Sequence, residues 1–492
     1  MKSWTRKERY ISLSKERLAD LKKLHDSIKN NRWRTFFHLQ PVTGFMGDTN
    51  GFSFFNGKWH LFYQWFPYGG VHGLKHWYHV ESKDLLNWHN VGLGIAPSND
   101  KDNQGVFSGS GYVEQDTLYL PYTGNKRDEN WIRYPYQMMA KMDKDGKITK
   151  LEKELIGPIN GYSEHQRDPK LFKEGDYYYI LIGFQDLEGK GKFLFLRSKQ
   201  IETDWEVYGE LKIQGYDDFG FMVECPDIEK IDDKWILLFS PQGLKAKGEY
   251  FNNVYNNTYF IGDLDLETLT FIPDSELKEL DRGFDFYAAQ CTSDPNDQNH
   301  IYLSAWCGLP DSVYEPIEEL GYSGLQVFTR ELTIKDGKLI QMPIDNYEAL
   351  KGNCYINSDT SINGALKGPS ILEIKELEGD FEVDLCNFKV NYDANNKKLV
   401  MDRGQMTNQL NIDFGLTRTI TLENDLKDLL ILLDTSIIEI FINKGEYVAT
   451  ARIFPNEDEN GYSILMNKGN IQMYDALRSV TDDFVIYPSE DK

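Results

Sequence analysis

The sequence predicts an all-β protein, a five-bladed β-propeller followed by a C-terminal β-sandwich, with a short N-terminal helical extension. Five similar strand–turn–strand units have turns centred near residues 57, 115, 175, 233 and 297, at spacings of 58, 60, 58 and 64 residues. Each interval leaves room for two more strands, which completes a propeller blade. Unrelated hairpins in a sandwich are the alternative, and the regular period favours the propeller.

The N-terminal extension, residues 1–32, contains one predicted helix at 14–29. Leu18, Leu21, Leu24 and Ile28 lie on one helical face, and Ser14 is placed to cap the first turn. The first residues are charged and lack the apolar segment of a signal peptide, and no run is apolar enough to span a bilayer. We therefore expect a cytoplasmic protein with this helix packed on its main body.

The predicted propeller domain, residues 33–350, begins with the clearest hairpin of the chain. An Asn56-Gly57 turn joins two aromatic strands, and Asn-Gly between alternating apolar runs is a strong hairpin signal. Asp48 precedes this hairpin in a stretch rich in Gly and Asn. The sequence therefore places Asp48 in a turn at the mouth of the first blade.

Polar residues precede the next turns at similar intervals. Ser108, Asp168 and Glu224 lie seven, seven and nine residues ahead of their turn centres, and Asp48 lies nine ahead of the first. Equivalent positions in successive blades lie at one end of a propeller, so the three carboxylates would converge on its axial funnel. A nucleophile, a general acid and a stabilising charge are what a glycosidase requires. Singly, each carboxylate is as readily explained by capping, ion pairing or solvation.

The predicted sandwich domain, residues 355–492, has a different pattern of apolar and polar residues from the propeller. Its strands alternate, as at 381–385, and the strand at 437–442 leads through a turn at 443–446 into a further strand. Such alternation is typical of an antiparallel sandwich. No low-complexity linker separates the two domains, so we expect them to share a fixed interface.

Composition limits the partners of this chain. It has 54 basic and 77 acidic residues, a net charge of −23, which disfavours binding to nucleic acid or anionic membranes. An anionic substrate would need a local basic pocket. Aromatic residues make up 14% of the chain, in keeping with aromatic walls around a sugar. We expect a small-molecule sugar as the partner, and a monomer or homodimer.

Neither a metal nor a cofactor is expected. The five cysteines are scattered without the spacing of a zinc site or a disulfide framework. His72, His76 and His79 are the alternative metal candidate, but they lie in a strand-like segment and not on a helix.

The residues at these positions resemble glycoside hydrolase family 32, the β-fructofuranosidases. The stretch 46–51 is similar to the nucleophile motif of that family, and 107–110, 167–169 and 224–226 are similar to its next three motifs. The resemblance continues through 284–288 and into the sandwich at 434–439. It covers nearly the whole chain in order and implies the same propeller and sandwich.

The resemblance also implies roles for the carboxylates. Asp48 would attack the fructosyl unit, and Glu224 would protonate the leaving oxygen and then activate water, with retention through a covalent fructosyl-enzyme. Asp168 would stabilise the transition state, and Arg167 would steady Asp168 or touch the substrate. We expect Asp48 to have an ordinary or low pKa. Cys225 follows Glu224, and strand alternation would point it away from the site.

Further residues are expected to line the sugar site. Gln64 and Ser108 would supply hydrogen bonds, Phe107 an apolar face, and Asn50 a further contact. Two positions depart from the family motif, since Gly47 stands where Asn is usual and Thr49 where Pro is usual. These departures put full activity or ordinary substrate preference in question.

Within the family, stretches 67–75 and 240–244 resemble the intracellular members that act on sucrose 6-phosphate. His72 belongs to the first stretch, and Lys75 and Arg133 are the candidates for binding the phosphate, although each is as simply explained as a solvated cation. The alternatives are hydrolysis of free sucrose or short fructans, or a sugar-binding propeller with weakened catalysis.

Overall fold

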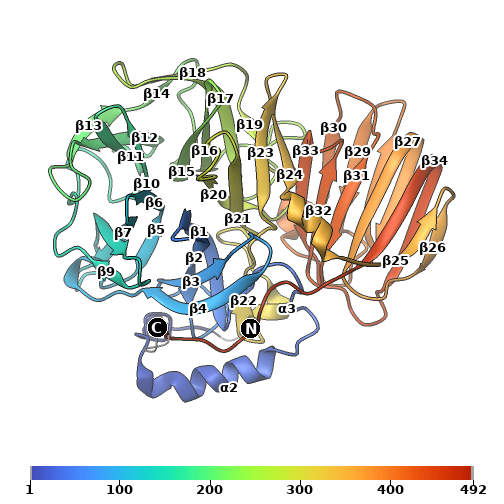
Figure 1. Ribbon diagram of the computed structural model, residues 1–492, viewed down its shortest axis with the longest axis horizontal. Helices are drawn as coiled ribbons and strands as arrows, with labels where there is room; N and C mark the ends of the chain where they lie inside the picture. Colours follow the sequence, from blue (N-terminus) through green and yellow to red (C-terminus); the bar gives the residue numbers. More distant parts are fainter. Residues whose placement is uncertain (1–2, 489–492) are drawn as a thin grey trace.

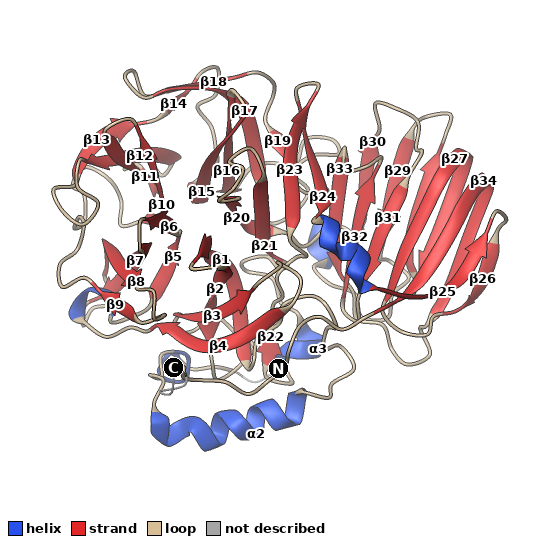
Figure 2. Ribbon diagram, viewed as in Figure 1, coloured by secondary structure: helices blue, strands red, loops and turns tan. Residues whose placement is uncertain are grey.

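The computed structural model describes residues 3–488 and confirms a five-bladed propeller with a β-sandwich at its side (Figure 1). Strands dominate, and the few short helices lie outside the sheets (Figure 2). The helical segments are α1 (Arg6–Arg9), α2 (Leu18–Ile28), α3 (Glu315–Glu318) and the 3-10 turns Lys15–Arg17, Asp100–Asp102, Asp345–Leu350 and Ile412–Phe414. None of these helices is both long enough and apolar enough to cross a membrane.

The predicted N-terminal helix is shorter than expected. A 3-10 turn at Lys15–Arg17 precedes α2, and Ser14 makes no side-chain capping bond. The prediction of a Ser14 cap was therefore wrong, because the first turn is not α-helical. Leu21 and Ile28 are buried, and α2 lies along the outside of the first blade, residues 44–95 (Figure 1).

The first blade includes one short strand that comes from much later in the chain. Its order is β22 (Tyr322–Ser323), β1 (Gly44–Phe55), β2 (Lys58–Phe66), β3 (His76–Ser82) and β4 (Trp88–Ile95). The short strand β22 lies in the sequence between the second and third strands of the fifth blade, and it pairs in parallel with β1. This pairing closes the ring of blades.

The other four blades follow in chain order, each with its first main strand innermost (Figure 1). The second has β5 (Val106–Gly109), β6 (Tyr112–Glu114), β7 (Thr117–Arg127), β8 (Arg133–Met142) and β9 (Ile148–Lys150). The third has β10 (Gln166–Glu174), β11 (Tyr177–Gln185), β12 (Gly191–Ser198) and β13 (Glu206–Glu210). The fourth has β15 (Met222–Ile231), β16 (Lys234–Gln242), β17 (Thr258–Asp265), β18 (Thr270–Pro273), β14 (Lys212–Ile213) and β19 (Lys278–Glu279). The fifth has β20 (Tyr287–Ser293), β21 (Ile301–Trp306), β23 (Arg330–Lys335) and β24 (Lys338–Pro343).

The sandwich, orange to red in Figure 1, is a single continuous antiparallel set of ten strands folded on itself. Its long strands β27 (Ser370–Leu385) and β34 (Gly461–Ala476) pair along most of their length. Its core gathers buried apolar side chains such as Phe381, Ile431, Ile440 and Met473. The strands are β25 (Lys351–Ser358), β26 (Ile362–Ala365), β27 (Ser370–Leu385), β28 (Phe388–Asp393), β29 (Lys398–Asp402), β30 (Thr417–Thr421), β31 (Leu429–Leu433), β32 (Ile437–Ile442), β33 (Tyr447–Arg452) and β34 (Gly461–Ala476).

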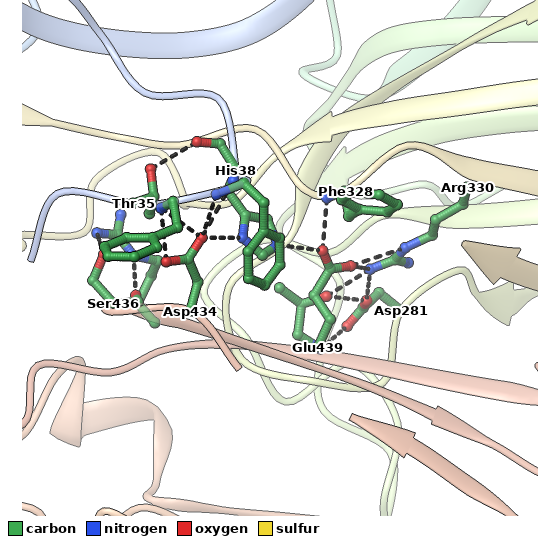
Figure 3. A network of polar contacts seen from close by, with 12 residues as sticks. Thr35, His38, Asp281, Phe328, Arg330, Asp434, Ser436 and Glu439 are labelled. Carbon is green, nitrogen blue, oxygen red and sulfur yellow. Dashed lines mark hydrogen bonds and ion pairs between the residues drawn. The ribbon is translucent and has the colours of Figure 1, made fainter. Parts of the chain in front are cut away.

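A buried ionic network joins the propeller to the sandwich (Figure 3). His38 lies between two carboxylates of the sandwich, with Nδ1 3.0 Å from Asp434 Oδ2 and Nε2 3.0 Å from Glu439 Oε1. Arg330 donates to Glu439 at 2.6 Å and to Asp281 at 3.0 Å. All five side chains are buried. The interface is therefore held by matched charges that neither domain supplies alone.

The network favours the charged form of His38. Burial lowers the pKa of His38, but its hydrogen bonds to Asp434 and Glu439 outweigh burial, and the pKa is raised above 6.5. Burial raises the pKa of each carboxylate, yet the same bonds, with Arg330 beside Glu439, leave both values lowered. The two carboxylates thus favour the protonated form of the buried His38.

Candidate active site

A β-bulge interrupts the innermost strand of every blade. The register shifts lie between Met46 and Thr49, Val106 and Gly109, Arg167 and Lys170, Glu224 and Asp227, and Tyr287 and Gln290. Bulges re-aim side chains and recur beside active sites. The prediction that Asp48 lies in a turn was wrong, because this bulge lies inside the continuous strand β1.

Positive backbone φ angles occur at three of these bulges. Asp168 has φ of 66°, Cys225 of 45° and Ala288 of 52°, values that non-glycine residues adopt at a cost in strain. The strain turns successive side chains toward the funnel. Cys225 Sγ consequently lies 3.9 Å from Asp48 Oδ2 and 3.7 Å from Asp168 Oδ2. The expectation that Cys225 points away was wrong, since strand alternation fails at the bulge.

Asp48 is held by a relay of two polar side chains, Ser108 from the second blade and Gln64 from its own blade. Ser108 Oγ donates to Asp48 Oδ2 at 2.6 Å, and Gln64 Nε2 donates to Ser108. Burial raises the pKa of Asp48, while the charge of Lys75 and the Ser108 bond oppose that rise without cancelling it. The expectation of an ordinary or low pKa was therefore wrong.

Glu224 receives donors from three other residues. Arg167 donates to Oε1 through Nε at 3.0 Å and Nη2 at 2.7 Å, while Gln242 and Tyr287 donate to Oε2 at 2.8 and 2.7 Å. Arg167 thus pairs mainly with Glu224 and approaches Asp168 only to 3.9 Å. The fork of donors fixes the plane of the carboxyl group that would transfer a proton.

Asp168 lies deeper in the funnel and interacts with both other carboxylates. Its Oδ2 accepts the backbone N–H of Cys225 at 2.9 Å. Burial raises the pKa of Asp168 to about 7, with Glu224 and Asp48 adding to the rise and Arg167 opposing it. Both ionisation states are accessible near neutral pH, so Asp168 can accept or donate a hydrogen bond there.

The predicted sugar contacts lie around these carboxylates. Phe107 is half-buried, and Gln64 and Ser108 are buried in the relay to Asp48. Asn50 is fully buried, with its amide donating to the Asp48 carbonyl and accepting the N–H of Gly109. The Asn50 side chain is therefore engaged within the protein and ties β1 to the second blade.

Lys75 and His72 meet close to Asp48. Lys75 Nζ lies 3.1 Å from His72 Nδ1 and 4.0 Å from the centre of the Phe45 ring. Burial lowers the pKa of Lys75 to about 7, although the charges of Asp48 and Glu224 raise it. Lys75 is not the solvated surface cation of the simpler reading, and it lies in the electrostatic field of both carboxylates.

Arg133 belongs to a cluster of cations at the rim. Its Nη1 lies 2.9 Å from His165 Nδ1, which also lies 3.0 Å from Arg167 Nη1. Burial, with repulsion from Arg167 and Arg127, lowers the pKa of Arg133 to about 10. The Nε atoms of Arg127 and Arg133 are buried without an acceptor in the described part of the chain.

The three clustered histidines do not converge. His72 contacts Lys75, His76 Nδ1 lies 3.0 Å from the Leu74 carbonyl, and His79 Nε2 lies 2.9 Å from His60 Nδ1. Residues 3–488 contain no group of three or more His, Cys, Asp or Glu side chains arranged to hold a metal ion.

Comparison with known families decides the classification. The glycosyl hydrolases family 32 N-terminal domain matches residues 38–343, and the family 32 C-terminal domain matches residues 372–481. This chain belongs to glycosyl hydrolase family 32.

Relatives of this family 32 member agree over nearly its full length. The sucrose-6-phosphate hydrolase of Staphylococcus xylosus is 38% identical over 484 residues, covering 95% of this chain and 97% of the relative. That of Vibrio alginolyticus is 37% identical, covering 92% of each. The solved sucrose-6-phosphate hydrolase of Lactobacillus gasseri is 35% identical with a TM-score of 0.91, covering 97% of this chain and 100% of that one. A Bombyx mori family 32 β-fructofuranosidase solved in complex with sucrose is 28% identical with a TM-score of 0.81, covering 95% and 100%.

The two departures from the family 32 motif are accommodated by neighbouring side chains. A Cβ added at Gly47 would lie 2.9 Å from the Phe45 ring, so Phe45 occupies the space beside the residue that precedes Asp48. Thr49 donates through Oγ1 to Gln326 Oε1, and Gln326 Nε2 donates to the Gly47 carbonyl at 2.7 Å. Proline at position 49 would lack this hydroxyl. Gln326 therefore holds both residues that flank Asp48.

Thr49→Val tests the role of that contact. The change keeps the shape of the side chain and removes the bond to the buried Gln326, so the Asp48 backbone loses one of its restraints. We expect kcat to fall about tenfold with little change in KM, because one buried hydrogen bond is lost. Thr43→Val is the matched control, since the buried Thr43 hydroxyl has no partner within the described residues. Equal kcat for the two variants would contradict the assignment.

Sequence reasoning missed several residues of this site. Tyr287 precedes the fifth turn much as the carboxylates precede theirs, so the repeat offered a signal for it. Gln242 follows the fourth hairpin, and no spacing rule identifies it. His165 and Gln326 reach the site through loops, and only the three-dimensional structure brings them there.

Proposed function

We propose that this family 32 enzyme hydrolyses sucrose 6-phosphate to fructose and glucose 6-phosphate, through a covalent fructosyl-enzyme with retention. The observation that carries the substrate assignment is the group of arginines at the rim, Arg127, Arg133 and Arg167, two of which have buried Nε atoms without acceptors. Such a cluster favours an anion, and Arg binds phosphate with two donors. The names of the relatives from Staphylococcus xylosus and Lactobacillus gasseri point to the same substrate.

In the first step Asp48 attacks the anomeric carbon of the fructosyl unit while Glu224 protonates the leaving glycosidic oxygen. Glucose 6-phosphate departs and an ester joins Asp48 to the fructosyl carbon. Glu224, now ionised, takes a proton from water, which attacks the same carbon and frees Asp48. Asp168 stabilises the oxocarbenium-like transition states through hydrogen bonds to fructosyl hydroxyls.

Lys75 is better placed for the nucleophile than for the phosphate. Its charge opposes the burial that would otherwise neutralise Asp48, and it is enclosed beside Phe45. We assign the phosphate to the Arg133 cluster and retain Lys75 as a support for the ionised nucleophile. A cytoplasmic location agrees with a phosphorylated sugar as substrate.

Hydrolysis of free sucrose is the second candidate activity, favoured by the sucrose complex of the Bombyx mori relative. A sugar-binding protein without catalysis is disfavoured by the three converging carboxylates. The wild-type ratio of kcat/KM for sucrose 6-phosphate and sucrose separates these possibilities. We expect sucrose 6-phosphate to be preferred.

Arg133→Ala tests the phosphate assignment. We expect KM for sucrose 6-phosphate to rise tenfold or more, because a charge-assisted hydrogen bond contributes about 1.5–3 kcal/mol. KM for sucrose should stay nearly unchanged. Arg197→Ala is the matched control, since Arg197 pairs with Glu206 across the strands β12 and β13. Equal effects of Arg133→Ala on both sugars would remove Arg133 from the phosphate site.

A further inference from the structure

The segment that precedes α2 lies against two loops at the rim of the funnel. We call residues 4–10 the strap. The Arg9 carbonyl accepts the Leu74 N–H at 2.7 Å, in the loop that carries Lys75. The Tyr10 ring meets the Trp131 ring edge-on at 4.9 Å, in the loop between β7 and β8. The strap therefore joins the loops of two adjacent blades.

The first of these loops is shaped to receive the strap. A Cβ at Gly69 would lie 2.2 Å from the Trp4 ring, and one at Gly73 would lie 2.5 Å from the Arg9 carbonyl. Trp4 also packs edge-on against Phe66. Side chains at these two glycines would displace the strap, so this contact depends on their absence.

The second loop is strained and carries cations. Trp131 has a φ of 68°, and the guanidinium groups of Arg6 and Arg127 lie 4.4 and 5.2 Å from the centre of its ring. Arg127 Nη1 also donates to the Trp131 carbonyl at 2.8 Å. Arg133 begins β8 directly after this loop. The strap thus braces, through Trp131, the loop that presents Arg127 and Arg133.

The strap also adds positive charge to the rim of a chain whose net charge is negative. Arg6, Arg9, Arg127 and Arg133 have no carboxylate within 4.0 Å in residues 3–488, although the chain carries a net charge of −23. Arg9 lies close enough to His72 to oppose its protonation. Glu164 and Glu224 attract Arg133, and Glu318 attracts Arg9, without forming an ion pair with either. Neighbouring cations still repel one another, and an anion placed among them relieves that repulsion.

We infer that the strap is a specificity-determining part of the site, which braces the Trp131 loop and completes a cationic rim for the 6-phosphate of the substrate. This inference rests on the proposed function. The strap would act through Trp131 and through its own charge, without contacting the reacting carbon. It should therefore affect binding of phosphorylated sugars and leave chemistry on the fructosyl unit unchanged.

The test compares the double variant Arg6→Ala/Tyr10→Ala with Lys7→Ala on both sugars. Lys7 is exposed in the same short helix, so it removes an equal charge from a position away from Trp131. In the double variant we expect KM for sucrose 6-phosphate to rise about tenfold with kcat unchanged, and KM for sucrose to stay within about twofold. The inhibition constant of glucose 6-phosphate, measured against sucrose hydrolysis, should rise by the same factor. Lys7→Ala should change none of these values.

A second variant, Arg6→Lys/Tyr10→Phe, retains the charge and the ring edge and should behave like the wild type. Equal losses on both sugars, an equal effect of Lys7→Ala, or an unchanged KM for sucrose 6-phosphate would each overturn the inference. The proposed function is tested separately, by the wild-type kcat/KM values for the two sugars. It fails if the wild type shows no preference for sucrose 6-phosphate over sucrose.

Discussion

Asp48→Ala should lower kcat by about 10⁴-fold or more on either sugar, and azide should restore turnover with an inverted fructosyl azide as product. The alanine leaves room on the face opposite the leaving group, and azide enters there while Glu224 still protonates the departing oxygen. Product configuration, determined by NMR, is the decisive measurement.

Glu224→Ala gives the complementary result. Loss of the general acid should lower kcat by about 10²–10⁴-fold, and azide should then yield a fructosyl azide of retained configuration. The reason is that Asp48 still forms the covalent intermediate, which azide attacks from the face that water normally uses. Retained product from Asp48→Ala would contradict the roles, since it would require another nucleophile such as Asp168. Thermal melting of both variants controls for folding.

The spacing of the hairpin turns predicted the blades and the convergence of the three carboxylates. It could do so because this spacing reflects the number of residues in each blade. Asp48, Asp168 and Glu224 precede their turns at near-equal intervals, and the fold brings those intervals to one end of the propeller. The side-chain directions were not predictable in this way. Alternation assigns Cys225 to the wrong face, because a bulge with a left-handed residue adds one position to the strand.

The environment of each group depends on contacts that no local pattern encodes. The high pKa of Asp48 arises from burial, and burial depends on how five blades pack. The strap shows the same limit, since Trp4 is far in sequence from Gly69, and Arg6 is far in sequence from Trp131. The sequence indicated a helix packed on the body, and only the fold places the residues before it against the rim.

Glu439→Gln is the interface change with the largest expected effect on stability. Glutamine keeps the shape but leaves His38 and Arg330 facing a neutral group in a buried site. Removing one partner of a buried ion pair costs about 3–5 kcal/mol. We expect a clear fall in the calorimetric melting temperature. Activity should be lost with it, because Leu39, next to His38, accepts the backbone N–H of Gln326, which holds the nucleophile strand.

The pH dependence of the melting temperature should reflect the three titrating groups of this network. The raised pKa of His38 contributes stability that is present below 6.5 and is lost as pH rises through its folded value. The lowered pKa values of Asp434 and Glu439 contribute stability present above 3.8 and 4.5, and lost as pH falls through their folded values. The contribution of this network to the wild-type melting temperature should therefore be largest between about pH 4.5 and 6.5. In Glu439→Gln the alkaline decline should be smaller and should end at lower pH, because one of the two anions that raise the folded-state pKa of His38 is gone.

Glu378→Gln is the matched control for that variant. Glu378 forms an exposed pair with Lys468 at 2.6 Å in the same sandwich domain, where solvent screens the interaction. It should leave both the melting temperature and its pH profile unchanged. If Glu439→Gln matched this control, the buried charges would contribute no more than a surface pair, and the coupling between sandwich and nucleophile strand would have to rest on apolar packing alone.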